Sequence, residues 1–319
     1  MAKILVTGGC GFIGTHLCEA LLDRGDEVRV LDNLSTGSVA NLPEGAELLH
    51  GDINHLADLI EGLEGVEACF HLAAVASVAR CVNDWPGTHR TNLSASIALM
   101  DEARRRGIPV VYASSAAAYG RGSMLPLEES AATLPLSCYG ADKLGCEQHA
   151  RAAGLTHGLA SAGLRFFNVY GPGQDPTSPY SGVISIFCER LRLGRPIEIH
   201  GEGRQTRDFI FVGDVVAALL AALPVASTAA PVVNVCTGHA VSILELAHIL
   251  SELYGVRPVI QHRPARAGDI EYSVGSPHLA RRLLGLGEPT PLEQGLRSLL
   301  AKPVIFAPER RFVRATANG

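Results

Sequence analysis

Short apolar runs alternate with longer segments in which apolar residues recur at helical spacing, from the first residues to about position 165. The first run, Lys3-Ile4-Leu5-Val6, is predicted to be a buried strand, and the segment behind it repeats apolar residues at helical spacing until Gly25. Further strands are predicted at Glu27–Leu31, Glu47–His50, Ala68–Ala73 and Ile108–Ala113. Strands that alternate with helices in this rhythm favour an α/β fold with a doubly wound parallel sheet.

A glycine-rich turn, Thr7–Gly14 (TGGCGFIG), joins the first strand to the first helix. Gly8, Gly11 and Gly14 would let the chain turn tightly and let backbone approach a pyrophosphate, while free N–H groups at the helix start attract its charge. With Asp32 at the end of the second strand, this pattern indicates a dinucleotide site of the short-chain dehydrogenase/reductase type. The Asp32 carboxylate would accept hydrogen bonds from the adenosine ribose and repel a 2′-phosphate, so NAD is expected rather than NADP.

A second candidate site combines Ser115, at the end of the fifth strand, with Tyr139 and Lys143 on a predicted helix from Ser137 to about Ala153. Residues four apart project from one helical face, and an ammonium near a phenol favours the phenolate form needed for general acid and base catalysis. Ser115 would hydrogen-bond the same substrate hydroxyl. The spacing Tyr-x-x-x-Lys alone also fits an ordinary amphipathic face, but the dinucleotide pattern upstream disfavours that interpretation.

Composition narrows the function classes. The chain has 319 residues and a formal net charge of −5, which argues against nucleic acid or an anionic membrane as main partner. The start of the chain lacks the pattern of a secretory signal, and the longest apolar run, 215–226, is too short to span a bilayer, so a cytoplasmic location is expected. The eight cysteines lack paired or metal-binding spacing, and we expect no metal and no disulfide.

Longer motifs make a family resemblance specific. They are TGGCGFIG (7–14), HLAA (71–74), SSAAAYG (114–120), YGADK (139–143), LRFFNVYGPG (164–173), QTRDFIFVGDV (205–215) and RAGDI (266–270). Through them the chain, from Lys3 to about Leu300, resembles extended short-chain dehydrogenase/reductases of the NAD-dependent epimerase/dehydratase family, and most of all bacterial UDP-hexose 4-epimerases.

The resemblance implies an NAD-binding Rossmann domain at 1–167 and a smaller, mostly C-terminal nucleotide-sugar-binding domain at 168–207 and 237–300. Residues 208–236 would return to the first domain, with strands at Phe209–Val215 and Val232–Val235, and 301–319 would form a tail. It also implies a homodimer through two helices, the one at 137–153 and another predicted from about Asp84 to Arg106.

The resemblance also implies roles for individual residues. Catalysis would use Ser115, Tyr139 and Lys143. NAD would be bound by Gly8, Gly11, Phe12, Ile13, Gly14, Asp32, Asn33, Asp52, Ile53, Leu72, Ala73, Ala74, Asn92, Tyr139 and Lys143. A UDP-sugar would be bound by Ser77, Ser115, Asn168, His200, Arg207, Arg266, Asp269 and Ser273. Among these, the two arginines would clamp the pyrophosphate, for which planar guanidinium groups are suited.

The residues after Ser115 bear on the reaction. Related dehydratases and decarboxylases place acids at the positions of Ala116 and Ala117, and a methyl group cannot transfer protons. Hydride removal and return through a 4-keto sugar then remains, as in a UDP-hexose 4-epimerase. Ser273 stands where enzymes restricted to glucose and galactose carry a bulky tyrosine, although a shift of one residue would put Tyr272 there.

These residues favour UDP-GlcNAc and UDP-GalNAc as substrates, with UDP-Glc and UDP-Gal as a second pair. The alternatives are a UDP-glucuronate 4-epimerase, an NAD-dependent nucleotide-sugar dehydratase or decarboxylase, and a non-catalytic dinucleotide-binding protein on the same fold.

Overall fold

The computed structural model describes residues 1–76, 78–122, 124–175, 182–265 and 270–301, and its centre is a seven-stranded sheet in the order β11-β6-β5-β4-β1-β2-β3. Every neighbouring pair in it is parallel. The strands are β1 (Lys3–Thr7), β2 (Glu27–Asp32), β3 (Glu47–His50), β4 (Ala68–His71), β5 (Val110–Ser115), β6 (Ser161–Phe166) and β11 (Val232–Val235). The predicted doubly wound parallel α/β fold is confirmed.

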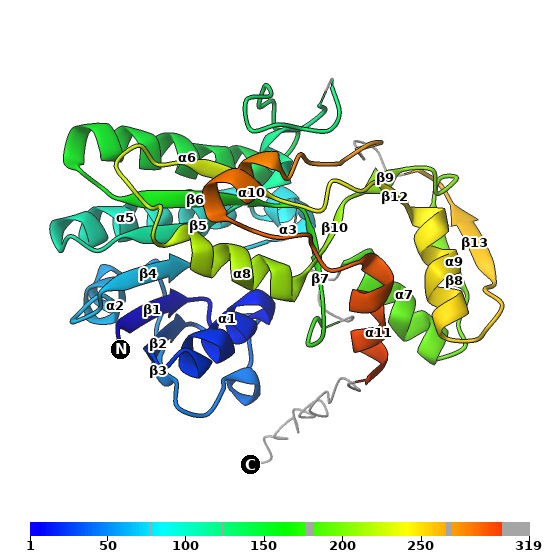
Figure 1. Cartoon of the computed structure of the whole chain (residues 1–319), viewed down its shortest axis with the longest axis horizontal. Helices are drawn as coiled ribbons and strands as arrows, with labels where there is room; N and C mark the ends of the chain where they lie inside the picture. Colours follow the sequence, from blue (N-terminus) through cyan, green and yellow to red (C-terminus); the bar gives the residue numbers. More distant parts are fainter. Residues whose placement is uncertain (77, 123, 176–181, 266–269, 302–319) are drawn as a thin grey trace, which may run out of the picture.

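Helices cover both faces of this sheet (Figure 1). On one face lie α1 (Phe12–Asp23), α8 (Val212–Ala222) and α10 (His278–Leu284), and on the other lie α2 (Leu56–Gly62), α5 (Ala95–Arg105) and α6 (Cys138–His157). Each layer buries its own apolar core against the sheet. Burial on two sides explains why the strands read as short continuous apolar runs instead of alternating ones.

A third apolar core lies beyond the sheet, at the right of Figure 1. It is built by α7 (Val183–Arg192), α9 (Ile243–Leu253), α11 (Leu292–Ala301) and the parallel pair β8 (Ile197–His200) and β13 (Ile260–Arg263). Two further pairs are β7 (Asn168–Tyr170) with β10 (Phe209–Phe211) and β9 (Thr206–Arg207) with β12 (Val241–Ser242). We propose this separation of cores as the division between a cofactor-binding and a substrate-binding unit.

The strand predicted at 209–215 is wrong beyond Phe211. Val212 begins α8, in which Val212, Val215, Val216 and Leu219 are buried at helical spacing. The preceding strand β10 pairs with β7 and is not part of the seven-stranded sheet, whereas β11 lies at its edge. A short apolar run has the same composition in a strand and in a buried helix, so the pattern alone did not separate the two.

Smaller differences concern the ends and the regularity of elements. β4 stops at His71, and β5 begins at Val110 and reaches Ser115. The helix predicted from 84 to 106 is divided into α4 (Trp85–His89), a π-helical turn η2 (Arg90–Ser94) and α5. Further short helices lie in the loops between these elements, namely η1 (Val39–Asn41), α3 (Val78–Asn83) and the 3₁₀ turn η3 (Ala116–Ala118).

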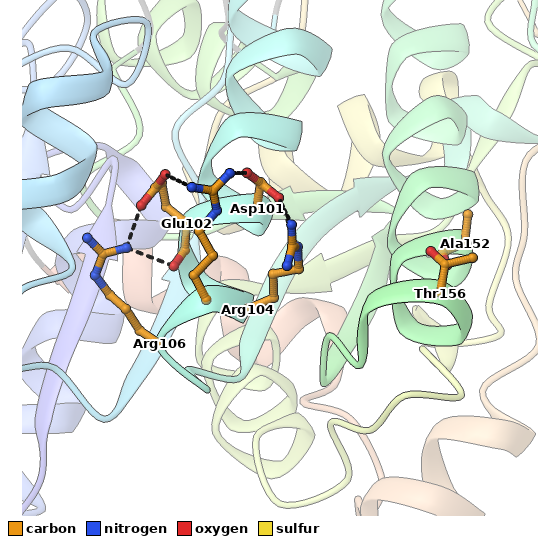
Figure 2. A network of polar contacts seen from close by, with 7 residues as sticks. Asp101, Glu102, Arg104, Arg106, Ala152 and Thr156 are labelled. Atoms are coloured by element: carbon orange, nitrogen blue, oxygen red, sulfur yellow. Dashed lines mark hydrogen bonds and ion pairs between the residues drawn. The ribbon is translucent and has the colours of Figure 1, made fainter.

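The last turns of α5 carry an ion-pair network in which Glu102 is buried (Figure 2). Asp101 pairs with Arg104 and Arg105, and Glu102 pairs with Arg106, all at the three- and four-residue spacings that bring helical side chains together. Arginines in the last turn also interact favourably with the negative end of the helix dipole.

Within the described residues, we find no helix with the length and apolarity needed to cross a membrane.

Candidate functional site

The glycine turn between β1 and α1 brings backbone atoms too close for any side chain. A Cβ on Gly14 would lie 2.2 Å from the Gly8 carbonyl oxygen, and a Cβ on Gly8 would lie 2.8 Å from the Ala73 nitrogen. Gly8 also has a positive φ of 73°, which favours glycine. Helix α1 then begins at Phe12 with no capping side chain from Gly11 and no acid in its first turn. This helix start presents a positive pole for an anionic group.

Asp32 lies at the rim of this turn and stabilises it. One carboxylate oxygen accepts a hydrogen bond from the Cys10 N–H at 3.0 Å, and the other accepts one from the Leu34 N–H at 2.8 Å. Because a carboxylate oxygen can accept two hydrogen bonds, both oxygens keep acceptor capacity for ribose hydroxyls.

Asn33 and Asp52 form the adjoining part of the predicted cofactor site. The Asn33 side chain donates to Asp52 at 3.1 Å, which joins the ends of β2 and β3. Burial opposes ionisation of Asp52, but hydrogen bonds from the Asn54 backbone and from the Asn33 and Asn54 side chains outweigh it, and the pKa lies below its ordinary value. The next residue, Ile53, is buried.

The segment after β4 is held by a buried chain of hydrogen bonds through His71. Thr7 Oγ1 accepts from the Ala73 N–H and so donates to His71 Nδ1, and His71 Nε2 donates to Ser96 Oγ, which in turn donates to the Asn92 carbonyl. This order requires a neutral imidazole protonated on Nε2. Burial, together with the nearby charge of Lys143, lowers the pKa of His71 to about 3.

Asn92 contacts this segment from η2. Its side chain accepts from the Val75 N–H at 2.7 Å and donates to the Val75 carbonyl at 3.0 Å. Leu72, Ala73 and Ala74, all half-buried, lie just before that contact point. A π-helical turn of this kind often marks a functional position. Here the π-helical turn points the Asn92 amide at the loop backbone, so we propose that Asn92 positions residues 72–75.

Tyr139 and Lys143 lie on one face of α6, as predicted from their spacing. The Lys143 ammonium is 6.0 Å from the centre of the Tyr139 ring and donates to the Ala113 carbonyl on β5 at 2.9 Å. Ser115 is the last residue of β5, and its hydroxyl accepts from the Ala117 N–H at 3.1 Å. Lys143 is buried, whereas Ser115 and Tyr139 are half-buried.

Gly140 allows α6 to approach the turn after Ser115. A Cβ at this position would lie 2.4 Å from the Ala117 carbonyl oxygen. Ser137 caps the helix by accepting from the Gly140 N–H at 3.1 Å. The start of α6, which carries Tyr139, is therefore packed directly on η3.

The predicted substrate residues that the structure describes lie mainly beyond the carboxyl ends of the strands. Asn168 is exposed at the start of β7, and its N–H donates to the Asp208 carbonyl. Arg207 donates to the Thr206 carbonyl at 2.8 Å and to the Ile270 carbonyl at 2.7 Å. These two bonds hold its guanidinium beside the segment that follows residue 269.

His200, at the end of β8, and Ser273 are two further predicted substrate residues. His200 Nδ1 donates to the Pro264 carbonyl at 3.1 Å, which leaves Nε2 and the ring face for other contacts. Ser273 is half-buried and donates its N–H to the Thr206 carbonyl, while the adjacent Tyr272 is 50% exposed. Ser77, Arg266 and Asp269 lie outside the described residues.

The model of the NAD dependent epimerase/dehydratase family matches residues 4–236. The chain belongs to this family. The match includes the glycine turn, Asp32, Ser115, Tyr139 and Lys143, and NAD is the cofactor.

Relatives of this epimerase-family chain cover almost its whole length. It is 37% identical over 271 residues to a putative UDP-glucose 4-epimerase of Methanocaldococcus jannaschii, covering 84% of this chain and 87% of the relative. Its structure is similar to that of the Thermotoga maritima UDP-glucose 4-epimerase with UDP-glucose (TM-score 0.89, 36% identity, 94% and 97% coverage). It is also similar to the Methanobrevibacter ruminantium UDP-N-acetylglucosamine 4-epimerase in complex with UDP-N-acetylmuramic acid (TM-score 0.88, 34% identity, 94% and 97% coverage).

The glycine turn of this family member fits the dinucleotide. Backbone atoms already lie within 3.3 Å of where a Cβ on Gly8, Gly11 or Gly14 would stand, and the start of α1 offers N–H groups to a pyrophosphate. We propose that the Asp32 carboxylate would accept hydrogen bonds from the ribose hydroxyls, since both oxygens keep acceptor capacity, and that its negative charge disfavours a 2′-phosphate.

Two buried carboxylates of the site were missed in the sequence. Glu147 on α6 pairs with Arg165 on β6 and accepts from Ser114 on β5. Asp208 accepts hydrogen bonds from Thr237, Gly238 and Gly275. It thereby connects its own segment to the segment at 237–238 and to the one at 275. Glu147 continues the four-residue spacing of Tyr139 and Lys143, and this spacing could have indicated from the sequence that Glu147 lies on the same helical face. Asp208 has no such signal, because its partners lie at least 29 residues away.

Proposed function

We propose that the chain is a UDP-hexose 4-epimerase that interconverts UDP-GlcNAc and UDP-GalNAc and also accepts UDP-Glc and UDP-Gal. The observation that carries the proposal is the approach of Tyr139 and Lys143 to the turn after Ser115. That turn, η3, is made of three alanines and packs on the first turn of α6. Tyr139 supplies a phenol and Ser115 a hydroxyl, whereas η3 itself carries no carboxylate, which suits reversible oxidation of an alcohol better than elimination.

Each residue of this proposed site has a distinct task. When bound, NAD accepts and returns the hydride. Tyr139 takes the proton of the sugar 4-hydroxyl and gives it back, while Ser115 hydrogen-bonds the same oxygen. The buried Lys143 ammonium places a positive charge 6.0 Å from the centre of the Tyr139 ring. Its bond to the Ala113 carbonyl holds that charge in place.

Inversion requires that the oxidised sugar present its other face while its nucleotide stays bound. Arg207 is held by two backbone carbonyls at 2.7 and 2.8 Å, and its planar guanidinium is suited to a pyrophosphate oxygen. Asn168 begins β7 and His200 ends β8, two strands that belong to separate two-stranded sheets. We propose that Asn168 and His200 hold the nucleotide together with Ser77, Arg266 and Asp269.

The choice of an N-acetylated sugar rests on Ser273. Tyr272 is half-exposed at the surface, and neighbouring residues of an extended segment point to opposite sides, so the serine is the better candidate for the pocket wall. A serine wall leaves room for an acetamido group. The similarity to the Methanobrevibacter UDP-N-acetylglucosamine 4-epimerase supports this choice.

The test is to incubate the purified protein separately with UDP-GlcNAc, UDP-Glc and UDP-GlcA and to follow the products by proton NMR. Appearance of UDP-GalNAc from the first supports the proposal in full. Inversion of UDP-GlcA alone would replace the substrate class by uronates. A dehydrated or decarboxylated product without inversion would overturn the epimerase assignment.

A further inference from the structure

A buried ion pair lies under the proposed site and joins the elements that carry its residues. Glu147 on α6 accepts two hydrogen bonds from Arg165 on β6, at 2.9 Å from Nε and 2.7 Å from a terminal nitrogen. The side chains are only 4% and 6% exposed. Paired arginine and carboxylate in this two-bond geometry fix orientation as well as charge.

The same carboxylate also holds β5. The Ser114 hydroxyl donates to the Glu147 oxygen that accepts from Arg165 Nε, and Ser114 directly precedes Ser115. Tyr139, Lys143 and Glu147 follow one another at four-residue spacing, so all three lie on the α6 face that contacts β5. Two bonds therefore connect this face to β5, from Lys143 to Ala113 and from Ser114 to Glu147.

Arg165 extends the connection beyond these strands. Its guanidinium lies 4.5 Å from the centre of the Tyr119 ring, and the Tyr119 hydroxyl donates to Asn234 on β11 at 2.7 Å. Tyr119 directly follows η3, the turn that Ser115 caps. The ion pair thus supports Ser115 from the strand before it and from the turn after it.

We infer that Glu147, through Ser114 and Arg165, is a positioning residue that sets the distance between Ser115 and the Tyr139–Lys143 pair. The inference rests on the proposed function, since it assigns those three residues to the reaction. Glu147 touches neither substrate nor cofactor in this role. Loss of its contacts lets α6 shift along β5, and a small misplacement of reacting groups lowers the rate without changing how tightly the substrate binds.

The mildest test removes one bond and leaves the ion pair intact. In Ser114→Ala we expect kcat for epimerisation to fall about tenfold, with KM for the UDP-sugar within about twofold. Amide hydrogen exchange over residues 137–147, measured by mass spectrometry on protein without added sugar, becomes faster. The matched control is Ser161→Ala, because Ser161 is also a fully buried strand serine but its hydroxyl has no hydrogen-bond partner among the described residues. It should leave both measurements unchanged.

A stronger test is Glu147→Gln, which keeps the side-chain shape and removes the charge. We expect kcat to fall about 100-fold with little change in KM. Its control is Glu102→Gln on α5, where a buried carboxylate is paired with Arg106 at the end of the helix (Figure 2). If Glu147→Gln does not fold, Ser114→Ala decides alone.

Unchanged exchange over 137–147 in Ser114→Ala, or equal effects of Ser114→Ala and Ser161→Ala, would overturn the inference. So would a rise in KM with constant kcat. If the wild-type protein inverts no sugar, the proposed function has failed, and the exchange experiment still decides whether Ser114 and Glu147 hold α6 in place.

Discussion

The ammonium of Lys143 lies 6.0 Å from the centre of the Tyr139 ring while it donates a 2.9 Å hydrogen bond to the Ala113 carbonyl. The bond to β5 matters because a free lysine side chain has many rotamers, whereas this one is buried and tied at its end. A fixed positive charge beside a phenol is the electrostatic basis of the proton transfer proposed for Tyr139.

Removal of the phenol hydroxyl tests this role directly. Tyr139→Phe should lower kcat for epimerisation by about 10²–10⁴, the contribution typical of a positioned acid or base. Sugar inversion is measured by NMR with protein shown to retain NAD. Tyr254→Phe is the control, since Tyr254 packs in the third core. Equal activity of Tyr139→Phe and wild type would remove Tyr139 from the mechanism.

Substitution of a glycine in the turn should weaken NAD binding. In Gly14→Ala the new methyl would lie 2.2 Å from the Gly8 carbonyl oxygen, so the turn or α1 must move. Overpacking of this kind costs about 1–3 kcal/mol, and we expect the dissociation constant for NAD to rise about tenfold or more. Calorimetric titration measures it.

The matched control is Gly287→Ala, because a Cβ there meets no atom within 4 Å. Tight NAD binding by Gly14→Ala would mean that the turn does not hold the cofactor.

His71 should make stability depend on pH. Its pKa is about 3 in the folded protein and about 6.5 in the unfolded chain, so the unfolded chain binds the extra proton. The stabilisation is therefore complete above about pH 6.5 and is lost as pH falls towards 3, with a loss of about 2 kcal/mol between pH 7 and 5. Urea unfolding at both pH values measures it.

His71→Gln should lack this pH-dependent contribution to the free energy of unfolding. The difference in unfolding free energy between wild type and the variant should therefore shrink by about 2 kcal/mol from pH 7 to pH 5. The exposed His149 on α6 provides the control variant, His149→Gln. A difference that stays constant with pH would show that His71 is not held neutral.

Ser273 can be tested through substrate choice. Ser273→Tyr fills the proposed wall, and we expect kcat/KM for UDP-GlcNAc to fall on the order of 100-fold while that for UDP-Glc changes only a few fold. Competition between the two sugars in one NMR tube gives the ratio. Tyr272→Ser is the control, because its side chain is half-exposed. A loss shared equally by both sugars would contradict the assignment.

The local parts of the site were predictable because they depend on short spacings. Gly8, Gly11 and Gly14 lie within seven residues, and Tyr139 and Lys143 within five, so a turn and one helical face bring them together. The ambiguity between strand and helix at Phe209–Val215 had the opposite origin. Apolar residues of such a segment are buried whether it is a strand or a helix. Only packing against the sheet decided that residues 212–215 form the start of α8.

The alternation of strands and helices up to about residue 165, the dinucleotide turn and the Tyr139–Lys143 face were determined by the sequence itself, because hydrophobic period and glycine placement act over a few residues. Only the tertiary structure decided that Glu147 meets Ser114 and Arg165, that His71 is neutral between Thr7 and Ser96, and that Asp208 gathers Thr237 and Gly275. Those partners lie 18 to 67 residues apart. A buried polar group takes whichever partner the folded chain brings within hydrogen-bond distance, and no local pattern records which one that is.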